Sequence, residues 1–383
     1  ILVIAFQKYW KWLYYTSFGL SWIIFNSWKA SKYVPEQHFG LACTFLILFF
    51  ITFYVTFLAY KLVQKEKYNI INILLLLTNS FLFYGNGYSL LSNNNLGYKL
   101  LGAFTLLNAI IHFIVCAIIF KQKLVDKNLI YFVFGLVLVF ITITIPVQLD
   151  GNWVTLLWAG EAAVLFWIGR SKNVPMFEKI AYPLMVVAFF SILHDWITLY
   201  HVYTIEQPEK WITPFLNINF LSSLFFITFF GWINYLYFHK ENTTEWKLFP
   251  KIANIISYGL PAILIIAIYF AFRLEIGNYW YQLHKASTIS ISTDPDSSNT
   301  FYRNIDLFMF KIVWIINYTL LFLSVLAFIN FKKIKNRTLE MITFGLLGVT
   351  IFLFLTQGLY MISELRENYL QEPLPQYYHS GII

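Results

Sequence analysis

Long apolar runs alternate with short polar segments along the whole 383-residue chain. A run of about 20 apolar residues forms a helix that can cross the roughly 30 Å hydrocarbon core of a bilayer. The expected fold is therefore an all-α polytopic membrane protein with short loops. The pattern predicts about eleven transmembrane helices, over residues 13–28, 38–60, 69–90, 97–120, 129–147, 153–169, 180–200, 214–238, 252–272, 306–330 and 339–363.

No soluble domain interrupts these helices, so we expect a single helical membrane domain over residues 1–383. The chain starts at Ile1 in an apolar stretch typical of the end of an earlier helix, so we expect it to be a piece of a longer protein. The longest connection on the outer side is predicted at 273–305. A tight turn at Asp150 and Gly151 is expected between two helices, because Asp-Gly pairs favour turns.

Composition supports this prediction, since 59% of the residues are hydrophobic and only 12% are charged, whereas soluble domains carry about a quarter charged residues. The net charge of +8 is uneven, because most of the 27 Lys and Arg residues fall in alternate loops. Loops rich in Lys and Arg usually remain cytoplasmic. This pattern predicts a multi-pass membrane protein whose Lys- and Arg-rich loops are cytoplasmic, and the high content of Phe, Ile, Lys and Asn indicates a bacterium, so we expect the bacterial inner membrane. The charge is then a matter of topology, so we expect membrane lipid as a partner and no nucleic acid.

One carboxylate, Glu161, lies inside the predicted helix 153–169. It follows Trp153 by eight residues, which places it roughly 12 Å below the interface. A charge at that depth normally faces a partner or a wet cavity. Trp158 joins Glu161 as a candidate site residue, and Gly160 and its alanine neighbours permit close helix packing. Glu161 is therefore either a proton-carrying or ligand-binding carboxylate, or a structural hydrogen bond or ion pair between helices.

Lys311 is the second charged residue within an apolar span. It follows Asp306 by five residues, so its depth is similar to that of Glu161. An ion pair between Lys311 and Glu161 would satisfy both groups. Alternatively, Lys311 extends its ammonium alone to the interface.

Further polar candidates fall in other predicted helices. Several such groups facing one cavity would suit a sugar or a lipid headgroup, whereas each alone is more often part of an interhelical hydrogen bond. No metal is expected, because no further His or carboxylate stands at ligand spacing. These candidates are Asn217, Asn219, His194 and Asp195 in the outer half, and Asn108 and His112, which share one helical face near mid-membrane.

Catalytic patterns are absent from the sequence: it has no nucleophile elbow, no zinc-protease motif and no phosphate-binding glycine loop. The sequence thus leans away from an enzyme, and no cofactor is expected. Cys43 and Cys116 both fall in apolar spans, which argues against a disulfide framework.

Two motifs resemble a known family. The hairpin residues Ile145-Pro146, Leu149, Gly151, Trp153, Leu156, Trp158-Ala159, Glu161 and Trp167-x-Gly169 resemble the signature hairpin of bacterial membrane proteins called the domain-of-unknown-function 2339 family. Pro214-Phe215-Leu216-Asn217 with Phe220-Leu221 is similar to that family's Pro-Leu-Leu-Asn and Phe-Leu segments, and residues 314–321 give a weaker third match. The resemblance implies many helices and no established activity. Gly160 departs from the bulkier residue of relatives.

Three functions follow as hypotheses. The first is binding or transport of an amphipathic envelope molecule, a lipid or glycolipid, from the outer half of the membrane. The second is a structural membrane subunit that scaffolds envelope machinery through protein partners. The third is an integral-membrane transferase that uses Glu161 or Asp195 as base.

Overall fold

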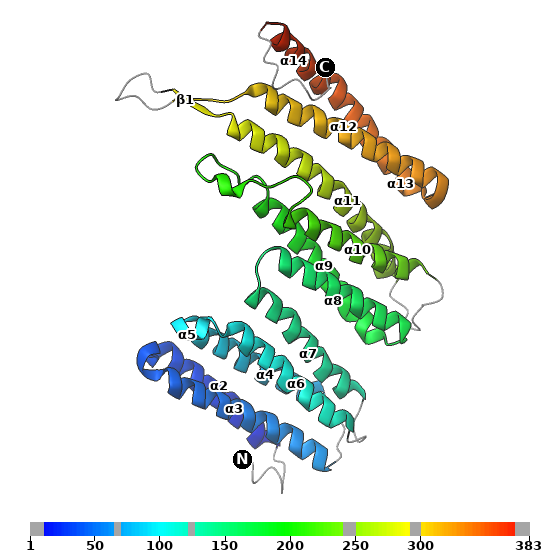
Figure 1. Ribbon diagram of the computed structural model, residues 1–383. Helices are drawn as coiled ribbons and strands as arrows, with labels where there is room; N and C mark the ends of the chain where they lie inside the picture. Colours follow the sequence, from blue (N-terminus) through cyan, green and yellow to red (C-terminus); the bar gives the residue numbers. More distant parts are fainter. Residues whose placement is uncertain (1–10, 65–69, 122–126, 240–249, 292–299, 372–383) are drawn as a thin grey trace. The chain divides into compact units, whose positions relative to one another are not determined.

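Within the residues that the structure describes, the chain is helical apart from a hairpin of two short strands (Figure 1). The computed structural model describes residues 11–64, 70–121, 127–239, 250–291 and 300–371. The chain divides into two compact units, Ile1–Asp150 and Gly151–Ile383. The sequence predicts one domain over 1–383, and it has no feature that marks a division, because the boundary falls within a short turn and not in a polar linker.

The first unit consists of antiparallel helices with an aromatic core. Its helices are α2 (Lys11–Lys32), α3 (Pro35–Gln64), α4 (Ile70–Ser92), the one-turn α5 (Asn95–Tyr98), α6 (Leu101–Lys121) and α7 (Lys127–Gln148). Phe50 of α3 stacks on Phe83 of α4 with ring centroids 4.2 Å apart, and Phe18 of α2 meets Phe53 edge to face. Such ring pairs stabilise the packing beyond the burial of apolar area.

The second unit contains the remaining helices and the hairpin. They are α8 (Asn152–Ser171), α9 (Pro175–Leu199), the short η1 (Pro208–Lys210), α10 (Ile218–Phe238), α11 (Pro250–Ala286), β1 (Ile289–Ile291), β2 (Thr300–Tyr302), α12 (Ile305–Ile329), η3 (Asn330–Ile334), α13 (Arg337–Leu353), η4 (Phe354–Gly358) and α14 (Leu359–Gln371). The strands pair antiparallel, with Ser290 opposite Phe301. Helix α13 continues through η4 into α14.

The all-helical multi-pass prediction is confirmed, because each predicted span coincides with one helix: α2, α3, α4, α6 to α12, and the continuous α13–η4–α14. Within the described residues, seven helices are long and apolar enough to cross a membrane. They include Pro175–Leu199, Ile218–Phe238 and Ala253–Ala286, and α7 adds the shorter apolar stretch Val133–Gln148.

The segment 273–305 differs from the predicted long connection. Helix α11 continues through it as far as Ala286 and has 37 residues, so it is about 55 Å long. The hairpin β1–β2 then leads into α12. Residues 273–286 of this predicted connection lie instead on a helix, where Glu275, Asn278 and Gln282 have partners in the segment between α9 and α10. Residues 292–299 of the same connection lie outside the described residues.

The predicted turn residues Asp150 and Gly151 lie between α7 and α8. Gly151 is the residue before α8 and has φ 57°. This left-handed conformation favours glycine, since a side chain is strained there. The glycine is therefore suited to the position just before the start of α8.

Candidate functional site

The polar end of α11 binds the segment that connects α9 to α10. Glu275 is only 2% exposed. Its carboxylate accepts hydrogen bonds from the Tyr200 hydroxyl at 2.6 Å and from the Phe215 backbone N–H at 2.7 Å. The Asn217 amide donates to both carboxylate oxygens at 3.0 Å. A buried carboxylate needs such donors, and these four bonds supply them.

Two further residues of α11 extend this attachment along one helical face. Asn278 accepts a hydrogen bond from the His201 backbone N–H at 3.0 Å. Gln282 accepts from the Ile212 N–H at 2.6 Å and donates to the Ile212 carbonyl at 2.9 Å. Residues 275, 278 and 282 are spaced three and four apart, so they face the same neighbour. The connecting segment 200–217 is thus held by side chains of α11.

Asn217, a predicted site residue, has two structural roles. Its side-chain oxygen accepts from the Phe220 N–H at 2.8 Å, which caps the N-terminus of α10. Its amide nitrogen binds Glu275, as above. The cap satisfies a backbone donor that the helix leaves free, so the Pro-Phe-Leu-Asn motif has a physical reason in the entry of the chain into α10.

Asn219 and Asp195 lie in hydrogen bonds that join α8, α9 and α10. Asn152 donates to Asn219 at 2.6 Å. Thr155 donates to Asp195 at 2.5 Å and bonds Ser191 at 2.6 Å. The first bond lies at the N-terminal ends of α8 and α10, and the other two join α8 to α9 about one turn further along α8. The arrangement fits the interpretation of interhelical hydrogen bonds.

His194 is exposed beside this group. Its Nδ1 lies 3.9 Å from an oxygen of Asp195, and its side chain is 74% exposed whereas that of Asp195 is 5% exposed. The two predicted candidates are adjacent in sequence, yet they face different surroundings. Successive residues on a helix point about 100° apart, since a turn has 3.6 residues.

Glu161 and Trp158 lie on α8 and are both partly buried. The neighbours Ala159, Ala162 and Ala163 are fully buried. A methyl group added at Gly160 would make an ordinary van der Waals contact, 3.5 Å, with the ring of Phe229 on α10, so this packing does not require glycine. Close packing surrounds the carboxylate.

Lys311 lies on α12 and faces α11. Its ammonium is 5.6 Å from the ring centroid of Tyr281. No ion pair joins Lys311 to Glu161 among the described residues. The pairing hypothesis therefore fails, and Lys311 instead belongs to the polar end of the α11–α12 hairpin.

Asn108 and His112 lie in the first unit, apart from the other candidates along the chain. His112 is fully buried, bonds the Tyr54 hydroxyl through Nδ1 at 2.7 Å and stacks on Phe140. Asn108 donates to the Phe104 carbonyl at 2.8 Å. Within the described residues, no group of three or more His, Cys, Asp and Glu is arranged to hold a metal ion.

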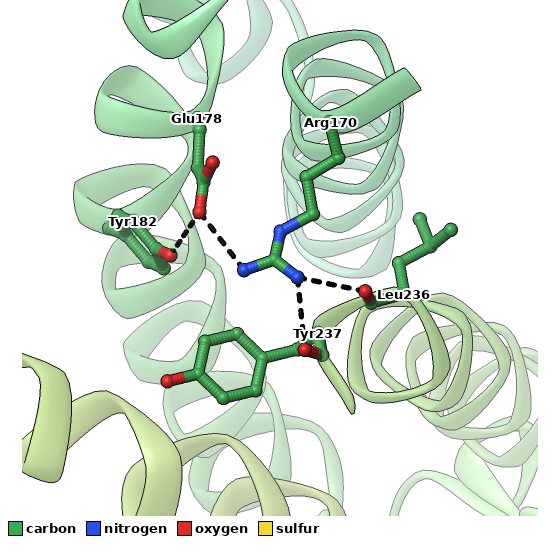
Figure 2. A network of polar contacts seen from close by, with 5 residues as sticks. All are labelled: Arg170, Glu178, Tyr182, Leu236 and Tyr237. Atoms are coloured by element: carbon green, nitrogen blue, oxygen red, sulfur yellow. Dashed lines mark hydrogen bonds and ion pairs between the residues drawn. The ribbon is translucent and has the colours of Figure 1, made fainter. Parts of the chain in front are cut away.

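Sequence reasoning missed a second charged cluster, around Arg170 (Figure 2). The Arg170 guanidinium donates to the backbone carbonyls of Leu236 and Tyr237, each at 2.9 Å. It also donates to Glu178 at 3.2 Å, and Tyr182 donates to the same carboxylate oxygen at 2.7 Å. The side chains of Arg170 and Glu178 are only 9% and 1% exposed. The cluster thus connects α8, α9 and the end of α10.

Gly169 explains the Trp-x-Gly part of the hairpin motif. A methyl group at this position would lie 2.7 Å from the Glu178 backbone nitrogen. A carbon atom cannot lie this close to a backbone nitrogen unless the backbone shifts. Only glycine therefore lets α9 approach α8 this closely. The Arg170 cluster depends on this close approach, because Glu178, the partner of Arg170, lies in the first turn of α9.

A cavity of about 1060 Å³ lies among α10, α11, α12 and α13. Its walls are mainly aliphatic and aromatic, with Pro261, Ile265 and Leu346 among the lining residues. Polar groups occur at one end, at Asn336 and Thr338, and at mid-helix, at Tyr269 and Thr319. Ligand sites usually combine apolar walls with a few polar groups and have volumes of about 300–1,000 Å³. None of the predicted candidates lines this cavity.

Helices long enough to cross a bilayer, joined by buried polar contacts, define a multi-pass integral membrane protein. The family described as "Predicted membrane protein (DUF2339)" matches residues 1–362, and the chain belongs to this family. No curated protein and no solved structure matches the chain.

Proposed function

We propose that this protein binds an amphipathic envelope lipid or glycolipid within its second unit and handles it in the membrane. The cavity among α10 to α13 carries the proposal. Its apolar walls suit an acyl chain, and its volume of about 1060 Å³ is large enough for a lipid-sized group. The side chains that line it lie on helices apolar enough to cross a bilayer, so a chain would reach them without crossing water.

The position of the headgroup is part of the proposal. The lining of the cavity on α11 extends from Ser257 to Tyr269, about 18 Å along the axis. Beyond Tyr269 the same helix becomes polar, with Arg273, Glu275 and Asn278. This change supports a ligand whose head lies at the 273–286 end, the predicted outer half of the membrane.

The other two hypotheses have less support. A transferase needs a base within reach of its substrate, but Asp195 is 4% exposed and bonded to Thr155. Asn217, Asn219 and Asp195 form hydrogen bonds within the bundle, which favours structural roles for these residues but does not indicate a partner protein for the scaffold hypothesis. It predicts a stoichiometric protein partner, and the experiment below also detects such a partner.

The test is native mass spectrometry of the full chain released gently from its own membranes. The wild-type protein should carry a bound lipid. Ala262→Trp should reduce lipid retention, because Ala262 lines the cavity and the indole would occupy part of the space for the ligand. Val349→Trp is the matched control, since Val349 on α13 is 59% exposed and does not line the cavity.

A wild-type chain without lipid would contradict the proposal. Equal lipid retention by Ala262→Trp and Val349→Trp would also contradict it. A chain that carries a partner protein and no lipid would favour the scaffold hypothesis. Elution of both variants as a single species of native size would show that they are folded.

A further inference from the structure

Two cations meet at the polar end of the α11–α12 hairpin. On α11, Arg273, Gly277 and Tyr281 are spaced four residues apart and share one face. A side chain added at Gly277 would lie 3.6 Å from Ile315 and 4.0 Å from Cε of Lys311, both on α12. The side chain of Lys311 thus passes over α11 at Gly277, which is one turn from Arg273 and one turn from Tyr281.

No carboxylate neutralises these cations within the described residues. The ion pairs there involve Arg170 with Glu178 and His194 with Asp195. Glu275 is two residues from Arg273 but binds Tyr200, Phe215 and Asn217. Asp306 on α12 accepts a hydrogen bond from Asn368 of α14.

Aromatic rings partly compensate for the missing counter-ion. The guanidinium of Arg273 lies 5.6 Å from the ring centroid of Phe270, and the ammonium of Lys311 lies 5.6 Å from that of Tyr281. The ammonium of Lys285 lies 5.5 Å from the centroid of the same Tyr281 ring. Cation–π contacts are attractive but leave the full positive charge in place. The group therefore retains a net positive charge that an anion would neutralise.

His201 adds a neutral nitrogen donor or acceptor beside the cations. Its ring meets Tyr281 with centroids 4.8 Å apart, and its backbone is held by Asn278. The residue as a whole is exposed, although its ring is partly covered by Tyr281. This partial burial, followed by the positive charges of Lys311 and Arg273, lowers the pKa of His201 to about 4. The side chain is therefore neutral at neutral pH.

The length of α11 is expected to place this group at the level of lipid phosphates. Helix α11 has 37 residues and is about 25 Å longer than the roughly 30 Å hydrocarbon core. One end must extend beyond the hydrocarbon, and the polar end is the one that begins near Arg273. The cations are thus expected near the interface, where headgroups lie.

We infer that Arg273 and Lys311, with Tyr281 and His201 beside them, bind the phosphate of an anionic lipid headgroup. Arginine presents a planar set of donors that fits phosphate oxygens, and lysine adds a compact charge. Arg273 lies one turn beyond Tyr269, a residue that lines the cavity. The inference deepens the proposed function, because it names the head of the ligand whose chain the cavity would hold.

The experiment uses the full chain in nanodiscs of phosphatidylcholine that contain a minor fraction of phosphatidylglycerol. Native mass spectrometry measures how strongly the protein retains the anionic lipid over the zwitterionic one. The double variant Arg273→Gln/Lys311→Gln should lose at least about tenfold of this preference, since each charge-assisted hydrogen bond contributes about one such factor. Lys332→Gln/Lys333→Gln removes the same charge in η3, just beyond the other end of α12, and should keep the preference.

Two results would overturn the inference: an unchanged preference in the Arg273→Gln/Lys311→Gln protein, or an equal loss in both double variants. Loss of the cation pair relieves repulsion, so this protein should remain folded, as circular dichroism and size-exclusion chromatography would show. Failure of the proposed function is a separate outcome. Ala262→Trp should lower total lipid binding, whereas the cation variant should remove only the preference for an anionic head.

Inorganic phosphate distinguishes the source of the anion. In phosphatidylcholine nanodiscs without phosphatidylglycerol, millimolar phosphate should leave the ¹⁵N resonances of the His201 ring unchanged if a lipid phosphate is the ligand. A shift that disappears in Arg273→Gln/Lys311→Gln would support the same site with a soluble phosphoryl ligand. If neither phosphate nor phosphatidylglycerol shifts the ¹⁵N resonances of the His201 ring, the proposed site would be overturned altogether.

Discussion

The side-chain amide of Asn217 lies 3.0 Å from both carboxylate oxygens of Glu275, a residue 58 positions further along the chain. Asn217 also caps α10, so one side chain determines where this helix begins and where the connecting segment attaches to α11. The bond thus relates a short motif between α9 and α10 to the polar end of α11. Neither residue alone indicates the contact.

Glu275→Gln should destabilise the attachment of segment 200–217. The substitution places an amide where the Phe215 N–H, the Tyr200 hydroxyl and Asn217 all donate, so at least one donor is left without an acceptor. An unsatisfied buried donor costs about 1–3 kcal/mol. Hydrogen exchange of residues 200–217 should become faster, whereas Glu206→Gln, at an exposed position of the same segment, should leave it unchanged. Equal protection in both variants would contradict this role.

Arg170→Gln should destabilise the second unit by about 3–5 kcal/mol, the usual effect of removing one partner from a buried ion pair. The variant leaves the Glu178 carboxylate buried without its cation. The double variant Arg170→Gln/Glu178→Gln should recover part of the loss. Thermal unfolding in detergent measures both, with the exposed Lys172→Gln as control. If the double variant were as unstable as the sum of the two single variants, the ion pair would not be coupled.

Gly169→Ala should be destabilising by about 1–3 kcal/mol, because the added methyl group overlaps the backbone of Glu178 and overpacking forces a shift. Gly231→Ala in α10 is the matched control, since nothing lies within 4 Å of its added methyl group. That change should be neutral or stabilising, because glycine within a helix is unfavourable by roughly 0.5–1 kcal/mol relative to alanine. Thermal unfolding compares the two. Equal effects would show that α8 and α9 can separate without loss.

His201 should make stability depend on pH in the acidic range. Its pKa is about 4 in the folded protein, and the ordinary value is 6.5. As the pH falls, the unfolded chain therefore binds this proton at a higher pH than the folded protein does. The contribution of neutral His201 to the free energy of unfolding is thus fully present above about pH 6.5 and is lost as the pH falls toward 4. The charged groups that face the ring are Lys311 on α12 and Arg273 on α11.

Thermal unfolding between pH 7 and 4.5 tests this prediction. His201→Asn should flatten the dependence, and asparagine is suitable because residue 201 has φ 62°, a conformation that asparagine tolerates. Lys311→Gln should raise the pKa of His201, as titration of its ring resonances would show. An unchanged titration in Lys311→Gln would mean that the two groups do not interact.

The sequence was most informative where a local rule applies. Length and apolarity predict every membrane helix near its position, because each span must satisfy its own backbone hydrogen bonds within lipid. The turn at Gly151 and the small residues beside Glu161 also follow from local chemistry. The division into two units does not, because it depends on which helices pack together.

The polar residues illustrate the opposite case. Asn217, Asn219 and Asp195 are recognisable as anomalies in apolar spans, but a sequence does not tell whether such a group faces a ligand or another helix. Arg170 and Glu178 were overlooked because each lies close to a span end, where charges are ordinary. Glu275 was overlooked because the polar stretch around it has the composition of a loop.

The amino-acid sequence alone therefore determined that this chain is a multi-pass membrane protein of the DUF2339 family, because hydrophobic periodicity and short motifs are local properties. Only the tertiary structure decided which polar groups are satisfied by one another and which are not. It joined Glu275 to Asn217 and left Arg273 and Lys311 without a carboxylate among the described residues. That outcome depends on contacts between residues far apart in the chain, and packing of the helices alone brings them together.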